Sequence, residues 1–341
     1  MMGYRTLVRT TLYAAVAVAA VAPAAAQETT LKLHHLQAPM TAAHRLFIAP
    51  WAKDVEAASG GKLKVQVFPS MQLGGKPEDL AGQVRDGVVD IVWTLPGYTP
   101  AAFTISDVLE LPFMVPSGIV GSQAFMEFGT KAAAADYQEY HVLVLHMHDA
   151  GEIHSKKPIL KLEDVQGLKA RVPSQAMGEA VKAWGGVPVY LPIPRVAEGL
   201  TRNEVEGIVT AWNVMRPLKL IEVTGYHTSL RMYSARFAML MNKASYQKLS
   251  PELRKLLDDK SGMALARKGG EIWDQEGKAS YDAAVKRGNK VADMDGAERA
   301  RWLKGAEPAY EQYVKDMNAK GLDGRKLLAE ARAAVAKYEK K

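Results

Sequence analysis

The chain has 341 residues, of which 44 are Lys or Arg and 37 are Asp or Glu, giving a formal net charge of +7 at pH 7. It contains 0 Cys, which excludes a disulfide framework and a lipid-anchoring cysteine. The basic residues are spread along the sequence, whereas a nucleic-acid-binding protein gathers them on one face or motif, so we expect no nucleic-acid partner.

Residues 1–26 are predicted to be a cleavable signal peptide. Arg5 and Arg9 form a positive start, an apolar run follows from Leu12 to Val21, and Ala24 to Ala26 supply the small residues of a cleavage site. The apolar run is too short to span a bilayer. We therefore expect an exported protein of the bacterial periplasm that relies on its core rather than on disulfides.

Strand and helix signals alternate through the first two-thirds of the chain. Lys62 to Phe68 is the clearest strand, because Leu63, Val65 and Val67 alternate with polar residues. Apolar periodicity and turn residues predict strands at 30–36, 62–68, 88–95, 141–148, 167–172, 187–191 and 205–210, and helices at 42–58, 77–85, 117–135, 174–184 and 194–202.

Beyond Asn242 the pattern is wholly helical, with a long run over 251–287. Strand–helix–strand units in series predict an α/β protein with two mostly parallel sheets, each covered on both faces. No internal repeat or low-complexity linker separates the units. We therefore expect two lobes that are joined by several crossings of the chain.

Arg171 is the first candidate for ligand binding, because it lies at the end of the strand predicted at 167–172. Ligands of open α/β sheets bind outside the carboxyl ends of the strands. The planar fork of guanidinium donors matches the two oxygens of a carboxylate. The alternative is an exposed arginine at a strand end, with no role in binding.

Five segments resemble the solute-binding receptors of tripartite ATP-independent periplasmic (TRAP) transporters, in order and in spacing. They are Val67–Gly75, Leu111–Phe113, Ser155–Ile159, Leu162–Arg171 and Val205–Gly207. The resemblance implies a two-lobed periplasmic binding protein with a central sheet in each lobe, a long helix packing across both lobes and a helical C-terminus. The run at 251–287 suits that long helix. We assign 27–148 with 237–276 to lobe one, and 149–236 with 277–341 to lobe two.

The resemblance also implies the function. A receptor of this kind closes on an organic acid, with Arg171 pairing with the ligand carboxylate, and delivers it to the small and large membrane subunits of a TRAP permease. No catalysis, cofactor or metal is implied. We expect the protein to be a monomer.

The chain departs from the common pattern of that family at two places. Members that bind dicarboxylates or sialic acid often carry a second arginine or polar group in the strand that here covers residues 148–154, which contain no arginine. Residues 206–213 lack the usual Glu-Asn pair. One cation among aromatic rings fits a monocarboxylate with an aromatic or apolar body, or a 2-keto or 2-hydroxy acid, better than a dicarboxylate. Besides Arg171, the candidate ligand contacts are Trp212, Thr210, Asn213, Trp93, Tyr98, Phe237, Tyr233, Gln72 and His35.

Several alternatives stay open. A C4-dicarboxylate-binding receptor belongs to the same transporter class, and a sensor-kinase receptor domain would use the same cleft. A secreted enzyme acting on organic acids is a third, although no nucleophile elbow, zincin motif or dinucleotide loop occurs. For Trp212 and Trp93 the alternative is packing in a core. His146 and His148 share one strand face but lack the further ligands that zinc requires, so we predict no metal site.

Overall fold

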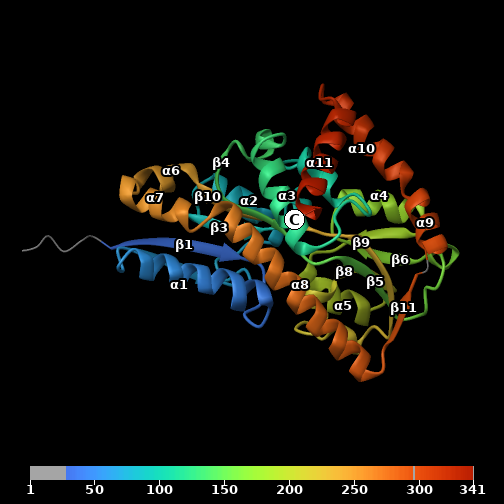
Figure 1. Cartoon of the computed structure of the whole chain (residues 1–341). Coiled ribbons are helices and arrows are strands. Elements are labelled where there is room, and N and C mark those ends of the chain that lie inside the picture. Colours follow the sequence, from blue (N-terminus) through green and yellow to red (C-terminus); the bar gives the residue numbers. More distant parts are fainter. Residues whose placement is uncertain (1–27, 295, 341) are drawn as a thin grey trace, which may run out of the picture.

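The computed structural model of the chain describes residues 28–294 and 296–340 (Figure 1). The predicted signal peptide at 1–26 lies outside these residues. The described chain forms two β-sheets with helices packed on them, which confirms the predicted two-lobed α/β fold. No helix in the described part of the chain is both long and apolar enough to cross a membrane.

The first sheet has the strand order β2-β1-β3-β10-β4. Strands β1, β2 and β3 run parallel, and β10 pairs antiparallel with both β3 and β4. The bounds are β1 Thr29–His35, β2 Leu63–Phe68, β3 Ile91–Thr94, β4 Tyr140–Met147 and β10 Arg236–Asn242.

The second sheet has the strand order β11-β9-β5-β8-β6-β7. Strand β5 pairs antiparallel with β8 and β9, and the other neighbours are parallel. The bounds are β5 Gly151–Ser155, β6 Lys169–Val172, β7 Val187–Tyr190, β8 Gly207–Ala211, β9 Tyr226–Tyr233 and β11 Lys290–Asp293. The antiparallel strands β5 and β10 each follow a crossing between the sheets, at 148–150 and at 234–235.

The helices cover both sheets and form the C-terminal part of the chain. Their bounds are α1 Ala49–Ala58, α2 Leu80–Arg85, α3 Gly118–Thr130, α4 Gln175–Ala183, α5 Val196–Thr201, α6 Lys243–Lys248, α7 Pro251–Asp259, α8 Gly262–Arg287, α9 Gly296–Gly305, α10 Glu307–Ala319 and α11 Gly324–Glu339.

Helix α8 runs diagonally from the first sheet to the second (Figure 1). It contacts α3 and β4 in the first lobe and the turn Trp212–Val214 in the second. Gly270 allows its close approach to α3, because a Cβ there would lie 2.4 Å from the carbonyl oxygen of Gly118. The long helix that packs across both lobes is thus present.

The structure differs from the sequence prediction in both strands and helices, and β5, β9, β10 and β11 are not among the predicted strands. The predicted helical run at 251–287 is two helices, because the chain breaks at Lys260 and Ser261 between α7 and α8. The region after Asn242 is not wholly helical, because β11 adds a parallel strand to β9 at the sheet edge. A strand of four residues is too short to show a clear alternation in the sequence.

The last helix packs on the first lobe, although residues 277–341 were assigned to lobe two. Lys337 and the Tyr338 hydroxyl both donate to the carboxylate of Glu127 in α3. The helix α10 before it contacts α4 of the second lobe. The C-terminal helices therefore hold both lobes, as α8 does.

Candidate ligand-binding site

A small cavity lies where the strand ends of the two sheets meet. The parallel strands β1, β3, β4, β6, β8 and β9 all point their carboxyl ends at it, which is where open α/β sheets bind ligands. The cavity has a volume of about 20 Å³. It is lined by Gln37, Leu95, Tyr98, His148, Arg171, Pro173, Ile193, Thr210, Ala211, Asn213, Val214, Tyr233, Ala235 and Phe237.

The structure brings together six of the ten residues that the sequence suggested. Arg171, Thr210 and Asn213 come from the second lobe, at the ends of β6 and β8. The aromatic members of the six are Tyr98, Tyr233 and Phe237.

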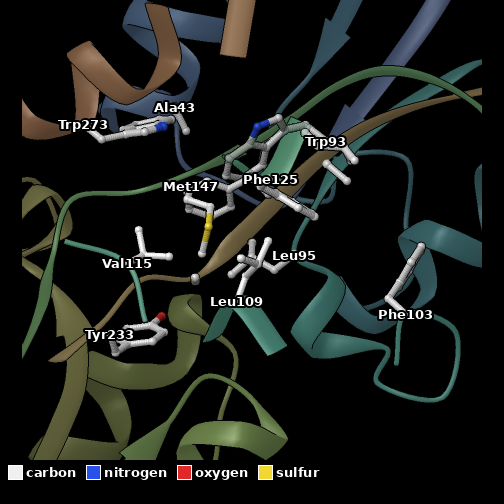
Figure 2. Packing of buried hydrophobic residues seen from close by; sticks show 14 of the residues in the cluster. Ala43, Trp93, Leu95, Phe103, Leu109, Val115, Phe125, Met147, Tyr233 and Trp273 are labelled. Carbon is white, nitrogen blue, oxygen red and sulfur yellow. The ribbon is translucent and has the colours of Figure 1, made fainter. Parts of the chain in front are cut away.

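Trp93 and His35 lie one layer behind the cavity. The Trp93 ring is fully buried and stacks on Phe237 with ring centroids 4.5 Å apart, while its Nε1 donates to His146 at 2.9 Å. His35 meets the edge of the Trp93 ring. Figure 2 shows Trp93 in the same buried cluster as Met147 and Tyr233. Trp93 thus supports Phe237 from behind and does not face the cavity.

Trp212 and Gln72 also lie outside the cavity lining. The Trp212 ring packs against His154, His227 and Tyr281, between the second sheet and α8. The alternative of core packing therefore describes Trp212. Gln72 is exposed in a turn, and Gln37, which follows β1, lines the cavity instead.

Arg171 is 1% exposed and its guanidinium is held by the backbone on both sides. Its Nε donates to the carbonyl of Leu191 at 2.7 Å, and its Nη1 to the carbonyl of Val209 at 3.0 Å. These carbonyls belong to the segment after β7 and to β8, the two strands that flank β6. Nη2 donates to the Tyr98 hydroxyl at 3.2 Å. Of the five guanidinium hydrogens, one on each terminal nitrogen is left for a ligand.

No carboxylate of the described residues forms an ion pair with Arg171, in contrast to Arg236, the other large buried arginine. Arg236 is 0% exposed and is paired with Glu110 at 2.9 Å and with Asp107 at 2.8 Å. A buried cation without a counter-charge is costly. Arg171 is therefore a strong candidate for binding an anion.

Asp149 does not neutralise Arg171. Burial raises the pKa of Asp149 to about 8, although a hydrogen bond from the Asn213 amide opposes the shift. This carboxyl is thus mostly protonated at neutral pH. Burial also lowers the pKa of His148 to about 4, so its ring is neutral. Arg171 is accordingly the cationic group among the described residues that line the cavity.

Tyr98 connects the lobes at this point. Its hydroxyl oxygen accepts the backbone N–H of Ile193 at 2.8 Å and the Nη2 hydrogen of Arg171, both from lobe two. Burial raises the pKa of Tyr98, so the hydroxyl keeps its own hydrogen. No described residue accepts that hydrogen. Tyr98 can therefore donate a second hydrogen bond to an anion placed beside Arg171.

The sequence suggested neither His148 nor Asp149 as a ligand contact, and His148 was considered only as a metal ligand. Their signal was their position at the end of the strand predicted at 141–148, which His148 closes and Asp149 follows, at the edge where ligands bind. His146 is satisfied by an indole donor, and no three His, Asp or Glu side chains within 28–294 and 296–340 converge as a metal site.

A wider cleft surrounds the cavity. One part, of about 530 Å³, is lined from lobe one by Leu36, Gln37 and Met71 and from lobe two by Leu191 and Ile193, among others. A second part, of about 250 Å³, shares Leu191 with the first part and is also lined by Tyr98 and Pro173. The inner cavity has room for about one water molecule. A ring-sized ligand therefore enters only when the lobes separate or side chains move.

The pKa values near the crossing predict how stability depends on pH. Burial raises the pKa values of Asp149 and Glu152 to about 8, while unfolded carboxyls titrate near about 4. The folded state then holds these protons more tightly, so stability falls as pH rises from about 4 to about 8. Histidines with lowered pKa values oppose this trend only below about 6.5.

We therefore expect the melting temperature to fall between pH 6.5 and pH 8, measured by calorimetry in one buffer series. Asp149→Asn keeps the size of the side chain and should flatten part of this slope. A melting temperature that rises over this range, or an unchanged slope in Asp149→Asn, would contradict the assignment.

Comparison with known proteins gives a consistent result. Residues 34–316 match the bacterial extracellular solute-binding proteins, family 7. A TRAP solute-binding protein from Rhodoferax ferrireducens T118, crystallised with copurified benzoate, is 35% identical with a TM-score of 0.89. That comparison covers 92% of this chain and 99% of the other.

Two further relatives differ in their ligands. A marine metagenome TRAP solute-binding protein specific for aromatic acid ligands, crystallised with 3-hydroxybenzoate, is 38% identical with a TM-score of 0.89, covering 92% of this chain and 99% of that one. The ectoine/5-hydroxyectoine-binding periplasmic protein UehA of Ruegeria pomeroyi is 28% identical over 254 residues, 72% of this chain and 73% of its own length.

Proposed function

The chain belongs to family 7 of the bacterial extracellular solute-binding proteins, the solute receptors of TRAP transporters, and on this premise we propose that it binds an aromatic monocarboxylate through Arg171. The family consists of receptors for organic acids and other small solutes rather than enzymes.

The observation that carries the proposal is the buried, unpaired guanidinium of Arg171. Its remaining hydrogens and that of the Tyr98 hydroxyl can together bind one carboxylate. A second carboxylate on the ligand would have no cation to pair with, because the other described residues of the lining carry no positive charge. Rings of Tyr98, Tyr233 and Phe237 instead favour an apolar, aromatic body.

The relatives support the same ligand class. The two proteins that are 35% and 38% identical over nearly the whole chain were crystallised with benzoate and with 3-hydroxybenzoate, respectively. Each ligand has one carboxylate on an aromatic ring. The UehA relative, at 28% identity, is named for a different solute, so we give more weight to the aromatic acids.

Binding is coupled to closure of the lobes. Arg171 belongs to lobe two and Tyr98 to lobe one, so a carboxylate held by both favours the arrangement in which the lobes meet. Closure excludes water and thereby strengthens the charge pair. We propose that the closed receptor, exported with removal of residues 1–26, then delivers the acid to the membrane subunits of a TRAP permease.

A thermal-shift panel followed by calorimetry tests the ligand class. We expect benzoate, 3-hydroxybenzoate and 3-hydroxyphenylacetate to raise the melting temperature, and succinate, malate and ectoine to leave it unchanged. The same mixtures should show no turnover by mass spectrometry. Stabilisation by succinate or malate, with none by the aromatic acids, would favour the C4-dicarboxylate alternative.

Tyr98→Phe should weaken binding of these acids by about tenfold or more. The substitution keeps the ring and removes a hydrogen bond to a charged group, which contributes about 1.5–3 kcal/mol. It also removes the acceptor that joins Arg171 to the backbone of Ile193. Calorimetry on the variant measures the loss, with Tyr246→Phe, remote from the cleft, as the matched control. An affinity within twofold of the original protein would exclude this role.

A further inference from the structure

A histidine–tyrosine pair lies beside Arg171 in the cavity lining and is not among the carboxylate contacts proposed above. His148 directly follows β4, and Tyr233 is the last residue of β9, so both lie at the crossings between the lobes. The Tyr233 hydroxyl lies 3.0 Å from Nε2 of His148. Both side chains are almost fully buried.

The hydrogen bonds of His148 determine where its hydrogen lies. Its Nδ1 is within hydrogen-bond distance of the carbonyl oxygen of Asp149, which can only accept. Its Nε2 lies 2.9 Å from the backbone N–H of Ala235, which can only donate. Nδ1 therefore carries the hydrogen and Nε2 carries none. Burial, which lowers the pKa of His148 to about 4, keeps the ring in this neutral form.

The state of His148 in turn fixes the polarity of Tyr233. Since Nε2 has no hydrogen, the Tyr233 hydroxyl is the donor in its 3.0 Å contact with that nitrogen, which also accepts the N–H of Ala235. Burial raises the pKa of Tyr233 well above its ordinary value, so the hydroxyl does not ionise. The phenol oxygen is left with lone pairs only, and no described residue donates to it. Tyr233 is therefore an acceptor, whereas Tyr98 is a donor.

The position of the Tyr233 ring is also fixed. A Cβ at Gly151 would lie 2.4 Å from Cδ1 of this ring, so the ring packs directly on the backbone of β5. A rigid acceptor discriminates between ligands more strongly than a mobile one, because it cannot turn away from a group that repels it.

We propose that the His148–Tyr233 pair is a specificity element that selects an aromatic monocarboxylate bearing a hydroxyl group on its body. The ligand hydroxyl donates its hydrogen to the Tyr233 oxygen while its carboxylate lies at Arg171 and Tyr98. The cavity lining thus offers donors at Arg171 and Tyr98 and an acceptor at Tyr233. An acceptor-only group in the place of the hydroxyl, such as a ketone, a fluorine or a second carboxylate, faces the lone pairs of Tyr233 and is disfavoured.

This inference rests on the proposed function, and it adds which aromatic acids are preferred. It predicts tighter binding of 2-hydroxy acids than of 2-keto acids, two classes that the sequence did not distinguish. Two pairs of acids are close in shape but differ in whether the substituent can donate a hydrogen bond. In the first pair mandelate carries a hydroxyl where benzoylformate has a ketone, and in the second 3-hydroxybenzoate carries a hydroxyl where 3-fluorobenzoate has a fluorine. The 2-, 3- and 4-hydroxybenzoates locate the position of the hydroxyl on the ring.

The test is calorimetric titration of these acids, with benzoate as the unsubstituted reference, into the full protein and into Tyr233→Phe. We expect the best hydroxylated acid to bind about threefold to tenfold more tightly than benzoate, the range for one neutral hydrogen bond. In Tyr233→Phe this preference should fall to within about twofold, because the variant keeps the ring and loses only the acceptor oxygen. The variant should fold, because Ala235 still satisfies Nε2 of His148. Tyr246→Phe is the matched control and should keep the preference.

Three results would overturn the inference. Equal affinity for benzoate and every hydroxylated acid would exclude hydroxyl selection while leaving the proposed function intact. An equal loss for benzoate and hydroxylated acids in Tyr233→Phe would assign the residue a structural role. Binding of no aromatic acid by the original protein would remove the proposed function together with this inference.

Discussion

Arg171→Ala is expected to abolish measurable binding of aromatic acids while the protein remains folded. Truncating one partner of a buried hydrogen-bonded charge pair costs about 2–5 kcal/mol, which lowers affinity by about 30-fold to several thousandfold. The fold should survive, because the guanidinium has no ion-pair partner among the described residues. Removing the guanidinium also removes the free-energy cost of burying a cation. This gain offsets part of the loss of its hydrogen bonds to Leu191 and Val209.

Arg171→Lys should rescue little of this affinity. An ammonium group is a single point charge and cannot contact both flanking carbonyls and a carboxylate at once. Calorimetry with 3-hydroxybenzoate and a melting curve for each variant separate binding from folding. Arg267→Ala on the surface of α8 is the matched control. An affinity of Arg171→Ala within threefold of the original protein would exclude the arginine from the site.

Arg236→Met, unlike Arg171→Ala, is expected to cause a large loss of folding stability. Arg236 donates to Glu110 and Asp107 and to the carbonyl of Phe103, all within a buried region. Its removal leaves two carboxylates there without a counter-charge, which costs about 3–5 kcal/mol. The free energy of unfolding from urea titration measures the loss.

A second substitution tests the cause of that loss. Glu110→Gln, introduced into Arg236→Met, removes one of the uncompensated charges and should recover part of the stability. Stability of Arg236→Met within about 1 kcal/mol of the original protein would contradict the account. No recovery in the double variant would show that packing, rather than charge, explains the loss.

Arg171 and Arg236 show which features of the site could be predicted from the sequence and which could not. Both lie at strand termini, and local sequence does not tell which one has carboxylate partners. The resemblance carried by Leu162–Arg171 selected Arg171. The partners of Arg236 lie more than a hundred residues away in the chain, at Glu110 and Asp107. Sequence patterns do not encode such long-range pairs.

The aromatic candidates show the same limit. Proximity to a strand end correctly predicted that Tyr98, Tyr233 and Phe237 line the cavity. The same criterion also selected Trp93 and Trp212, which pack outside the cavity lining. Which ring faces the cavity depends on neighbours from distant segments. The link between His148 and Tyr233 joins residues 85 positions apart, and the polarity of Tyr233 follows only from that contact.

A crystal structure of the protein with 3-hydroxybenzoate is the most direct test that a carboxylate binds at Arg171. We predict carboxylate oxygens about 2.7–2.9 Å from Nη1 and Nη2 of Arg171, with the Tyr98 hydroxyl donating to the same group. A bound acid whose carboxylate lies elsewhere in the cleft, with the guanidinium contacting protein acceptors alone, would contradict the account.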